Sequence, residues 1–250
     1  MARLGEMRLI LASGSPRRRE LLAQAGYVFA VQPADVDESV RAGEAAGDYV
    51  RRLAEEKAKA VYQKFANPTL IDKTHKHGAL GLLTAPQERS EAQPVFARLV
   101  AQESSSGAPS LPASSARVGY TNAPLMVLGA DTTVVCDGKI VAKPADAEDA
   151  KRMLRKLSGQ THEVLTGIAL VTQAEVVSEV ETTSVTFISI PEDELDFYCS
   201  TAEPMDKAGA YGIQGYAARW IPRIDGCYFN VMGLPIARVV RMIEAAAGFN

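Results

Sequence analysis

The sequence predicts an α/β fold, and three observations support this prediction. Short apolar runs typical of buried strands alternate with segments of helical periodicity. Glycine and proline punctuate the chain between these runs. The chain has 250 residues, of which 47% are hydrophobic. That is enough to bury a sizeable core, in one large domain or in two small lobes around a cleft.

The N-terminal part predicts two strands and two helices. The continuous apolar run over 7–12 indicates a buried first strand. Ser15 is placed to cap a helix that has Pro16 at its first position and ends near Gly26. The run over 27–33 predicts a second strand. Apolar residues at helical spacing predict a long helix over 44–66.

The segment 67–124 differs in composition, because it is rich in Ser, Ala, Pro and Gln and shows little periodicity. We expect a surface insertion that is largely disordered from 101 to 122. His75 and His77 lie in it. A metal site there would need a third ligand that the sequence does not offer, so a solvated basic loop is the favoured interpretation.

The C-terminal part predicts further alternation of strands and helices. The run over 125–135 suggests a strand, a Gly-Ala-Asp turn and more strand. Asp137-Gly138 is typical of a hairpin turn, and Asp146 is placed to cap a helix that stops at Gly159. Strands are expected at 162–172, 176–190 and 218–225, a short helix at 191–201 and an amphipathic helix at 233–248.

Composition excludes several classes of protein. The formal net charge of −3 gives no overall basic field for nucleic acid or membrane phosphates. Three widely spaced cysteines do not suggest a disulfide framework or a structural zinc site. No stretch approaches the length of an apolar membrane span. The sequence therefore predicts a cytoplasmic protein that binds neither nucleic acid nor membranes.

The stretch "LASGSPRRRELL" predicts an anion site. A helix N-terminus offers unpaired N–H groups and partial positive charge, and the Ser-Gly-Ser turn before it lets backbone approach a ligand. Arg17 and Arg18 add guanidinium groups that match phosphate oxygens. Each cation in the first helical turn destabilises the helix by roughly a few tenths of a kcal/mol. A bound polyanion would offset this cost. The alternative is a solvated helix face, or pairing of the two arginines with acidic residues elsewhere in the chain.

Two acidic positions are candidates for catalysis or metal binding. Asp131 follows an apolar strand beside a glycine, where a carboxylate often holds metal or activates water; a turn aspartate bonded to local backbone is the equal alternative. Glu38 follows the second predicted strand and could share a magnesium ion with phosphates, although in isolation a polar loop is the favoured interpretation.

Three lysines and a glutamine complete the candidates. Lys57 lies on the long helix after two glutamates, so an exposed ion-paired face is the simpler interpretation. Lys143 and Lys207 each precede a break in chain direction, from which a lysine can reach phosphate. Gln214 lies in a glycine-rich segment and can present one donor and one acceptor group to a base edge.

Taken together, the motifs resemble those of the Maf family of nucleoside triphosphate pyrophosphatases. The matching pieces occur in the family's order and cover most of the chain outside 67–124: "LASGSPRRRELL", "YVRRLAEEKAKA", "LGADTTVV", "DAEDAKRMLRKLSGQTHEVLTGIAL", "DKAGAYGIQG" and "NVMGLPI". The resemblance implies a mixed twisted sheet with flanking helices, in one domain of two lobes around a central nucleotide-binding cleft.

The resemblance also implies a reaction and roles. The reaction is hydrolysis between the α- and β-phosphates of a nucleoside triphosphate, with Mg²⁺ or Mn²⁺. By motif matching, Asp131 is the general base or a metal ligand and Glu38 a metal ligand. The implied phosphate-binding residues are Ser13, Arg17, Arg18, Lys57, Lys143 and Lys207. The combination of Arg17, Thr132 and Gln214 resembles the subgroup that acts on dTTP and UTP, including modified pyrimidine triphosphates.

Two alternatives stay open. One is the same chemistry on 7-methyl-GTP, against which Thr132 and Gln214 argue. The other is a nucleotide-binding regulator of cell division with little turnover, against which the intact Asp131, Glu38 and Lys57 argue. In either enzymatic case the protein would remove non-standard nucleotides, with an associated role in arresting cell division. A homodimer is a further expectation, and about 50 residues of 67–124 look additional to the family pattern.

Overall fold

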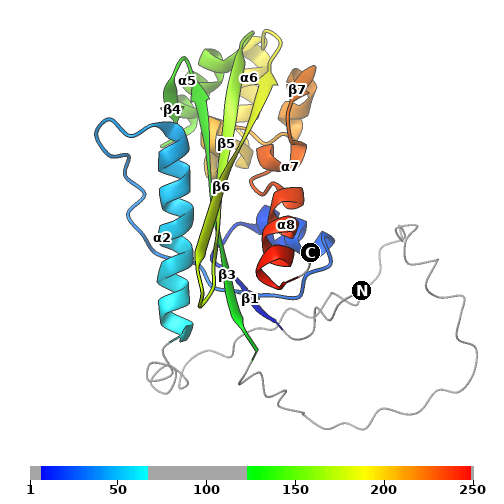
Figure 1. Ribbon diagram of the computed structural model, residues 1–250. Helices are drawn as coiled ribbons and strands as arrows, with labels where there is room; N and C mark the ends of the chain where they lie inside the picture. Colours follow the sequence, from blue (N-terminus) through cyan, green and yellow to red (C-terminus); the bar gives the residue numbers. More distant parts are fainter. Residues whose placement is uncertain (1–6, 67–122, 249–250) are drawn as a thin grey trace, which may run out of the picture.

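The structure is a computed structural model that describes residues 7–66 and 123–248 (Figure 1). A seven-stranded mixed sheet runs in the order β2-β1-β3-β5-β6-β7, and β4 pairs with β3. β1 is parallel to both of its neighbours, and the other pairs are antiparallel. The strands are β1 (Arg8–Leu11), β2 (Ala30–Val31), β3 (Leu125–Cys136), β4 (Lys139–Val141), β5 (Thr161–Val171), β6 (Val176–Thr186) and β7 (Arg223–Asp225).

Helices cover both faces of this sheet, which confirms the predicted mixed α/β fold. The α-helices are α1 (Pro16–Gln24), α2 (Ala46–Ala66), α5 (Ala147–Leu157), α6 (Glu192–Cys199), α7 (Tyr228–Val231) and α8 (Ile236–Ala246). Three short 3-10 helices lie between α6 and β7: η2 (Glu203–Asp206), η3 (Ala208–Ala210) and η4 (Tyr216–Trp220). In the described part of the chain, no helix is long and apolar enough to cross a membrane.

The predicted insertion over 67–124 lies outside the described residues, except for Ala123 and Pro124, and so do His75 and His77. Its character therefore stays a prediction.

Local sequence signals at helix and hairpin ends are confirmed. Ser15 caps α1, and its hydroxyl accepts a hydrogen bond from the backbone N–H of Arg18. Asp146 caps α5 in the same way. Asp137 and Gly138 both have positive φ, of 50° and 68°, which is the backbone of a tight hairpin turn between β3 and β4.

Three sequence predictions about strands are wrong. The second strand, expected over 27–33, is only Ala30–Val31, since it pairs with β1 alone at the sheet edge. Of the strand expected over 218–225, the first three residues belong to the helical turn η4 and only the last three form a strand, β7. No turn interrupts β3 at Gly129. Gly129 pairs with Ala169 of β5, and its neighbour Leu128 pairs with Leu11 of β1.

Gly129 in β3 has a different function from the expected turn: it lets α2 approach the sheet. A Cβ atom on Gly129 would lie 2.1 Å from the carbonyl oxygen of Ala54. In the neighbouring strand β5, a Cβ on Gly167 would lie 2.2 Å from the carbonyl oxygen of Val50. The backbone of α2 therefore rests directly on two strands, at positions where only glycine fits.

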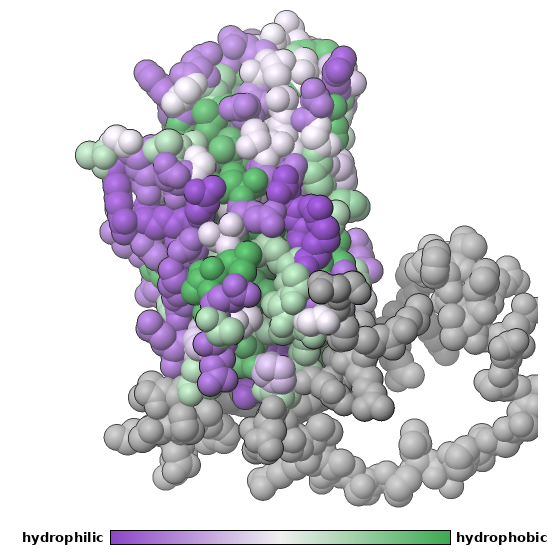
Figure 2. Space-filling model, viewed as in Figure 1, coloured by the Kyte–Doolittle hydropathy of each residue, from purple (hydrophilic) through white to green (hydrophobic). Residues whose placement is uncertain are grey.

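The core side chains form groups on both faces and at both ends of the long strands. α1 and α8 pack against β1, β3 and β5 through Leu21, Leu128 and Val239, among others. At the other end, α5 and α6 pack with Trp220 against the ends of β3, β5 and β6 (Figure 1). The implied division of one domain into two lobes stays a prediction. On the face drawn in Figure 2, hydrophilic side chains form a broad band across the middle of the molecule.

His162 on β5 is a buried titratable group. Its side chain is 2% exposed, and its Nε2 forms a 2.7 Å hydrogen bond with the Tyr211 hydroxyl. Burial lowers the pKa of His162 to about 4 and raises the pKa of Tyr211. The imidazole is therefore neutral in the folded protein at neutral pH.

We predict that replacing Gly167 by alanine destabilises the fold by about 3 kcal/mol, since the new methyl group overlaps the α2 backbone. Gly47→Ala, near the start of the same helix with open space around it, is the matched control and should be neutral or slightly stabilising. Urea unfolding of both variants measures the difference. Equal stability of the two variants would contradict the close packing of α2.

We also predict that acid destabilises the protein through His162. The unfolded state binds a proton at this residue below about pH 6.5, whereas the folded state does so only near pH 4. Stability should therefore fall with decreasing pH across that window, by about 1.4 kcal/mol per pH unit from this group. In His162→Gln this contribution to the slope should vanish. Urea unfolding at several pH values measures this slope. If His162→Gln lost stability with pH as steeply as the wild type between about pH 6.5 and 4, the prediction would be refuted.

Candidate active site

The ten residues to which the family resemblance assigns site roles line one cleft of about 650 Å³. They come from both sides of β3: α1, the loop after β2, α2, the segment after β4, and the turns between α6 and β7. The members are Ser13, Arg17, Arg18, Glu38, Lys57, Asp131, Thr132, Lys143, Lys207 and Gln214. Five of the side chains lining the cleft are basic and three are acidic, so the cleft is locally positive although the chain is not.

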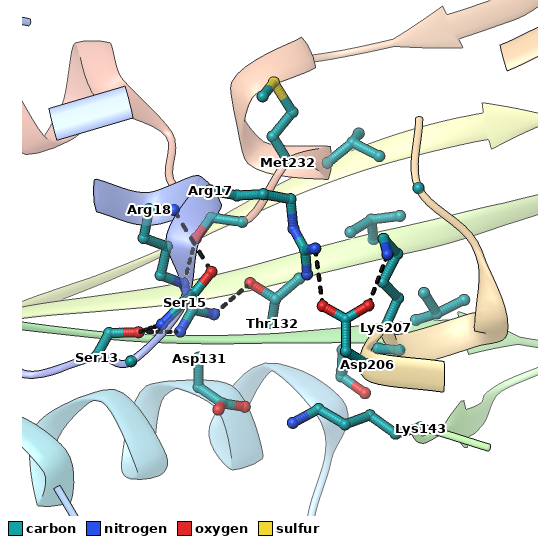
Figure 3. A pocket seen from close by; sticks show the side chains of 18 of the residues that line it. Ser13, Ser15, Arg17, Arg18, Asp131, Thr132, Lys143, Asp206, Lys207 and Met232 are labelled. Atoms are coloured by element: carbon teal, nitrogen blue, oxygen red, sulfur yellow. Dashed lines mark hydrogen bonds and ion pairs between the residues drawn. The ribbon is translucent and has the colours of Figure 1, made fainter. Parts of the chain in front are cut away.

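Asp131 and Thr132 are neighbours in the middle of β3, so their side chains point to opposite faces of the sheet. Asp131 faces α2, where its Oδ1 lies 2.7 Å from Lys57 Nζ. Thr132 faces α1 and accepts a hydrogen bond from Arg18 (Figure 3). The expectation that Asp131 ends a strand is wrong: β3 continues to Cys136, because β4 and β5 pair with it beyond that point.

Lys57 joins the two acidic candidates. Its ammonium group lies 2.6 Å from Glu38 Oε1 and 2.7 Å from Asp131 Oδ1, and both Lys57 and Asp131 are 8% exposed. Burial would raise the pKa of Glu38, but the hydrogen bond and charge of Lys57 outweigh it, and the net pKa is lowered. Lys57 is thus not the exposed, ion-paired surface lysine that its glutamate neighbours suggested.

Arg18 is bound by the protein on several sides. Nε donates to the carbonyl of Gly233, Nη1 to the carbonyl of Ala130 and the Ser13 hydroxyl, and Nη2 to Thr132 Oγ1, all at 2.8–3.1 Å. Burial lowers the pKa of Arg18, and the nearby Asp131 carboxylate opposes this. The interactions use four of the five N–H donors of a guanidinium group, so Arg18 mainly fixes the floor of the cleft. Its role as a phosphate ligand stays a prediction.

Arg17 and Lys207 meet across the cleft through Asp206. Arg17 Nη1 lies 3.0 Å from one carboxylate oxygen of Asp206, and Lys207 Nζ lies 2.6 Å from the other (Figure 3). Lys207 also donates to the carbonyl of Glu203. Burial would raise the pKa of Asp206, but its bonds to Lys207 and Arg17 lower it. The carboxylate therefore holds two cations in position at the mouth of the cleft.

Lys143 and Gln214, like Glu38, are exposed, whereas the other seven members are buried or partly buried. Lys143 follows β4, and its ammonium group points toward the Asp131 side of the cleft (Figure 3). Gln214 lies between η3 and η4 in the glycine-rich segment and lines the cleft. Both side chains can reach a ligand without breaking contacts that hold the fold.

The acidic pair fits a divalent cation. Glu38 and Asp131 both contact one ammonium group, so both can reach a single cation. Among the described residues, no group of three His, Cys, Asp or Glu side chains could hold a metal ion. Magnesium commonly takes one or two carboxylates and completes its shell with water and substrate phosphates. The donor set therefore suits a cation that binds together with a phosphate ligand.

Sequence reasoning missed three groups that shape the cleft. Asp206 precedes Lys207 directly in "DKAG", so adjacent opposite charges were an available signal. Tyr211 lines the cleft, and its hydroxyl group is hydrogen-bonded to the buried His162. Thr166 lies beneath Thr132 as its cross-strand partner, which local sequence gave no reason to single out.

The sequence is similar to those of known proteins over most of its length. A family model for Maf-like proteins matches residues 8–246. A dTTP/UTP pyrophosphatase of Koribacter versatilis is 42% identical, covering 96% of this chain and 95% of the relative. Proteins with the same name from Hahella chejuensis and Bacillus cytotoxicus are 40% and 38% identical, covering 96% and 95% of this chain and 92% and 94% of the relatives. The chain belongs to the Maf-like protein family.

Proposed function

We propose that this protein is a nucleoside triphosphate pyrophosphatase that hydrolyses dTTP and UTP to the monophosphate and pyrophosphate. The observation that carries the proposal is the buried Lys57–Asp131 ion pair, which the more exposed Glu38 joins at a cleft lined by further cations. The names of the relatives support the same activity and substrates. By the same reasoning, the enzyme keeps modified pyrimidine nucleotides out of nucleic acids.

Binding of the triphosphate would use the positive side of the cleft. The N-terminus of α1 follows the Ser-Gly-Ser turn and offers N–H groups to phosphate oxygens. Arg17, Lys143 and Lys207 add three cations around the same space. Asp206 holds Arg17 and Lys207 when no ligand is bound, and a phosphate group would take over these contacts.

Hydrolysis would use Asp131 as the group that accepts the proton of the attacking water. Its Oδ1 is held by Lys57, and Oδ2 can then take the proton as water attacks the α-phosphorus atom. Cations beside the β- and γ-phosphates stabilise the charge that develops on the leaving pyrophosphate. A divalent cation, Mg²⁺ or Mn²⁺, held by Glu38 and Asp131 would neutralise phosphate charge and acidify water.

Recognition of the base would fall to Thr132 and Gln214, with Arg17 beside them. A cleft that hydrogen-bonds a base edge rejects bases that leave its polar groups unpaired. We further propose that the enzyme works in the cytoplasm, since all three cysteines are free thiols, and that it forms a homodimer.

Replacing Asp131 by asparagine should lower kcat for pyrophosphate release from UTP and dTTP by about a thousandfold, because the amide cannot accept the proton. The affinity for triphosphate should change little. Asp225→Asn, an exposed carboxylate on β7 outside the cleft, is the matched control and should keep full activity.

The same assay separates the alternatives. Near-normal turnover by Asp131→Asn would remove Asp131 from the mechanism. Turnover of 7-methyl-GTP alone by the wild type would keep the chemistry and overturn the substrate. Triphosphate binding without turnover would favour the regulator.

Replacing Lys57 by glutamine leaves Glu38 and Asp131 without their shared cation. The unfolding free energy near neutral pH should fall by about 2 kcal/mol, less than for a fully buried pair because Glu38 is half exposed. Added Mg²⁺ should recover part of this loss. Lys59→Gln, on the exposed side of the same helix, should cost less than about 0.5 kcal/mol. Equal losses for the two variants in urea unfolding would disprove the role of Lys57.

A further inference from the structure

A chain of side-chain hydrogen bonds runs from the cleft into the core behind Thr132. Arg18 Nη2 lies 2.9 Å from Thr132 Oγ1, and Thr132 Oγ1 lies 2.9 Å from Thr166 Oγ1. Thr166 Oγ1 lies 3.1 Å from the backbone oxygen of Asn230. Figure 3 shows the first of these links. Thr132 and Thr166 are directly opposite each other on β3 and β5.

Only one placement of the hydroxyl protons satisfies all three bonds. The Asn230 carbonyl can only accept, so Thr166 donates its single proton to it. Thr166 has no second proton, so Thr132 donates to Thr166. Arg18 can only donate, so Thr132 accepts from Arg18. The chain therefore has one direction, from Arg18 through both threonines to Asn230.

The far end of this chain is fixed in the core. Thr166 and Asn230 are both fully buried. The Asn230 side-chain amide donates to the carbonyl of Val164 at 2.9 Å and to Thr183 Oγ1 at 3.0 Å. Its backbone oxygen also accepts from the N–H of Gly233. Reversal of the chain would leave buried polar atoms unpaired, so its direction is stable.

The direction of the chain determines what Thr132 can offer a ligand. Its proton is used by Thr166 and one lone pair by Arg18, which leaves one lone pair for the cleft that Thr132 lines. Gln214 carries both a donor and an acceptor and can turn to match either kind of base edge. Thr132 cannot adapt in this way, so it is the group that can discriminate.

We propose that Thr166 and Asn230 are positioning residues for base selection, which hold Thr132 as an obligate hydrogen-bond acceptor toward the base. The cleft then favours a base whose ring nitrogen carries a proton, as in the imide of uracil and thymine. It rejects a base whose equivalent nitrogen is an acceptor, as in cytosine, because two lone pairs would face each other. This inference rests on the proposed function and extends it to residues that do not touch the substrate.

The test compares two replacements of Thr166 by their ratio of kcat/KM for UTP to that for CTP. In Thr166→Val the Thr132 hydroxyl proton loses its acceptor and can turn toward the cleft. The ratio should therefore fall about tenfold, mainly because kcat/KM for CTP rises. Thr166→Ser keeps the hydroxyl and should keep the wild-type ratio. If Thr166 only stabilised the fold, Thr166→Val would lower kcat/KM for UTP and for CTP by the same factor, and the ratio would not change.

A second measurement needs no variant. Wild-type enzyme should turn over N3-methyl-UTP at least about tenfold less efficiently than UTP, since the methyl group removes the donor. The control is 5-methyl-UTP, which carries an added methyl group but retains the N3 proton and should be accepted.

An unchanged UTP to CTP ratio in folded Thr166→Val would overturn the inference alone, and so would equal turnover of UTP and N3-methyl-UTP by the wild type. If Thr166→Val does not fold, the wild-type comparison of N3-methyl-UTP and 5-methyl-UTP with UTP tests the inference. A wild type that turns over no triphosphate would overturn the proposed function and this inference with it.

Discussion

The close contact of α2 with the sheet is the constraint on which the cleft depends. Without side chains at Gly129 and Gly167, the helix backbone lies directly on β3 and β5. Lys57, one turn along α2 from Ala54, therefore reaches Asp131, two residues along β3 from Gly129. The helix also brings Lys57 within reach of Glu38 from the loop after β2. A bulkier residue at either glycine would separate the lysine from its carboxylates, because interiors this closely packed do not yield by an ångström without cost.

Arg18 has the corresponding role on the opposite face of β3. A cation in the first turn of α1 opposes the helix dipole, and its four bonds to β3, Ser13 and the Gly233 carbonyl offset this. The same guanidinium sets the direction of the hydrogen bonds through Thr132. The two neighbouring residues Asp131 and Thr132 are thus held by different cations on different faces of the sheet. In our proposal, the first accepts a proton and the second recognises the base.

Sequence reasoning reached most of the fold and the membership of the cleft, because capping residues, turn glycines and strand patterns act locally. Ser15 with Pro16 and Asp137 with Gly138 are examples. It failed where a residue serves a distant contact. Gly129 resembles a turn residue, yet it is required by a helix far away in the chain. Arg18 resembles a phosphate ligand, yet most of its donors bind the protein. Thr166 carries no local signal, since its importance comes from register with Thr132. The roles of the cleft residues in catalysis stay predictions.

The most direct test of the central claim is the identity of the products formed from UTP, followed by phosphorus NMR in water enriched in heavy oxygen. Attack by water at the α-phosphorus atom predicts UMP and pyrophosphate in equal amounts, with the heavy oxygen in UMP. Formation of UDP and inorganic phosphate, or heavy oxygen in the pyrophosphate, would contradict the account of how Asp131 and the surrounding cations act.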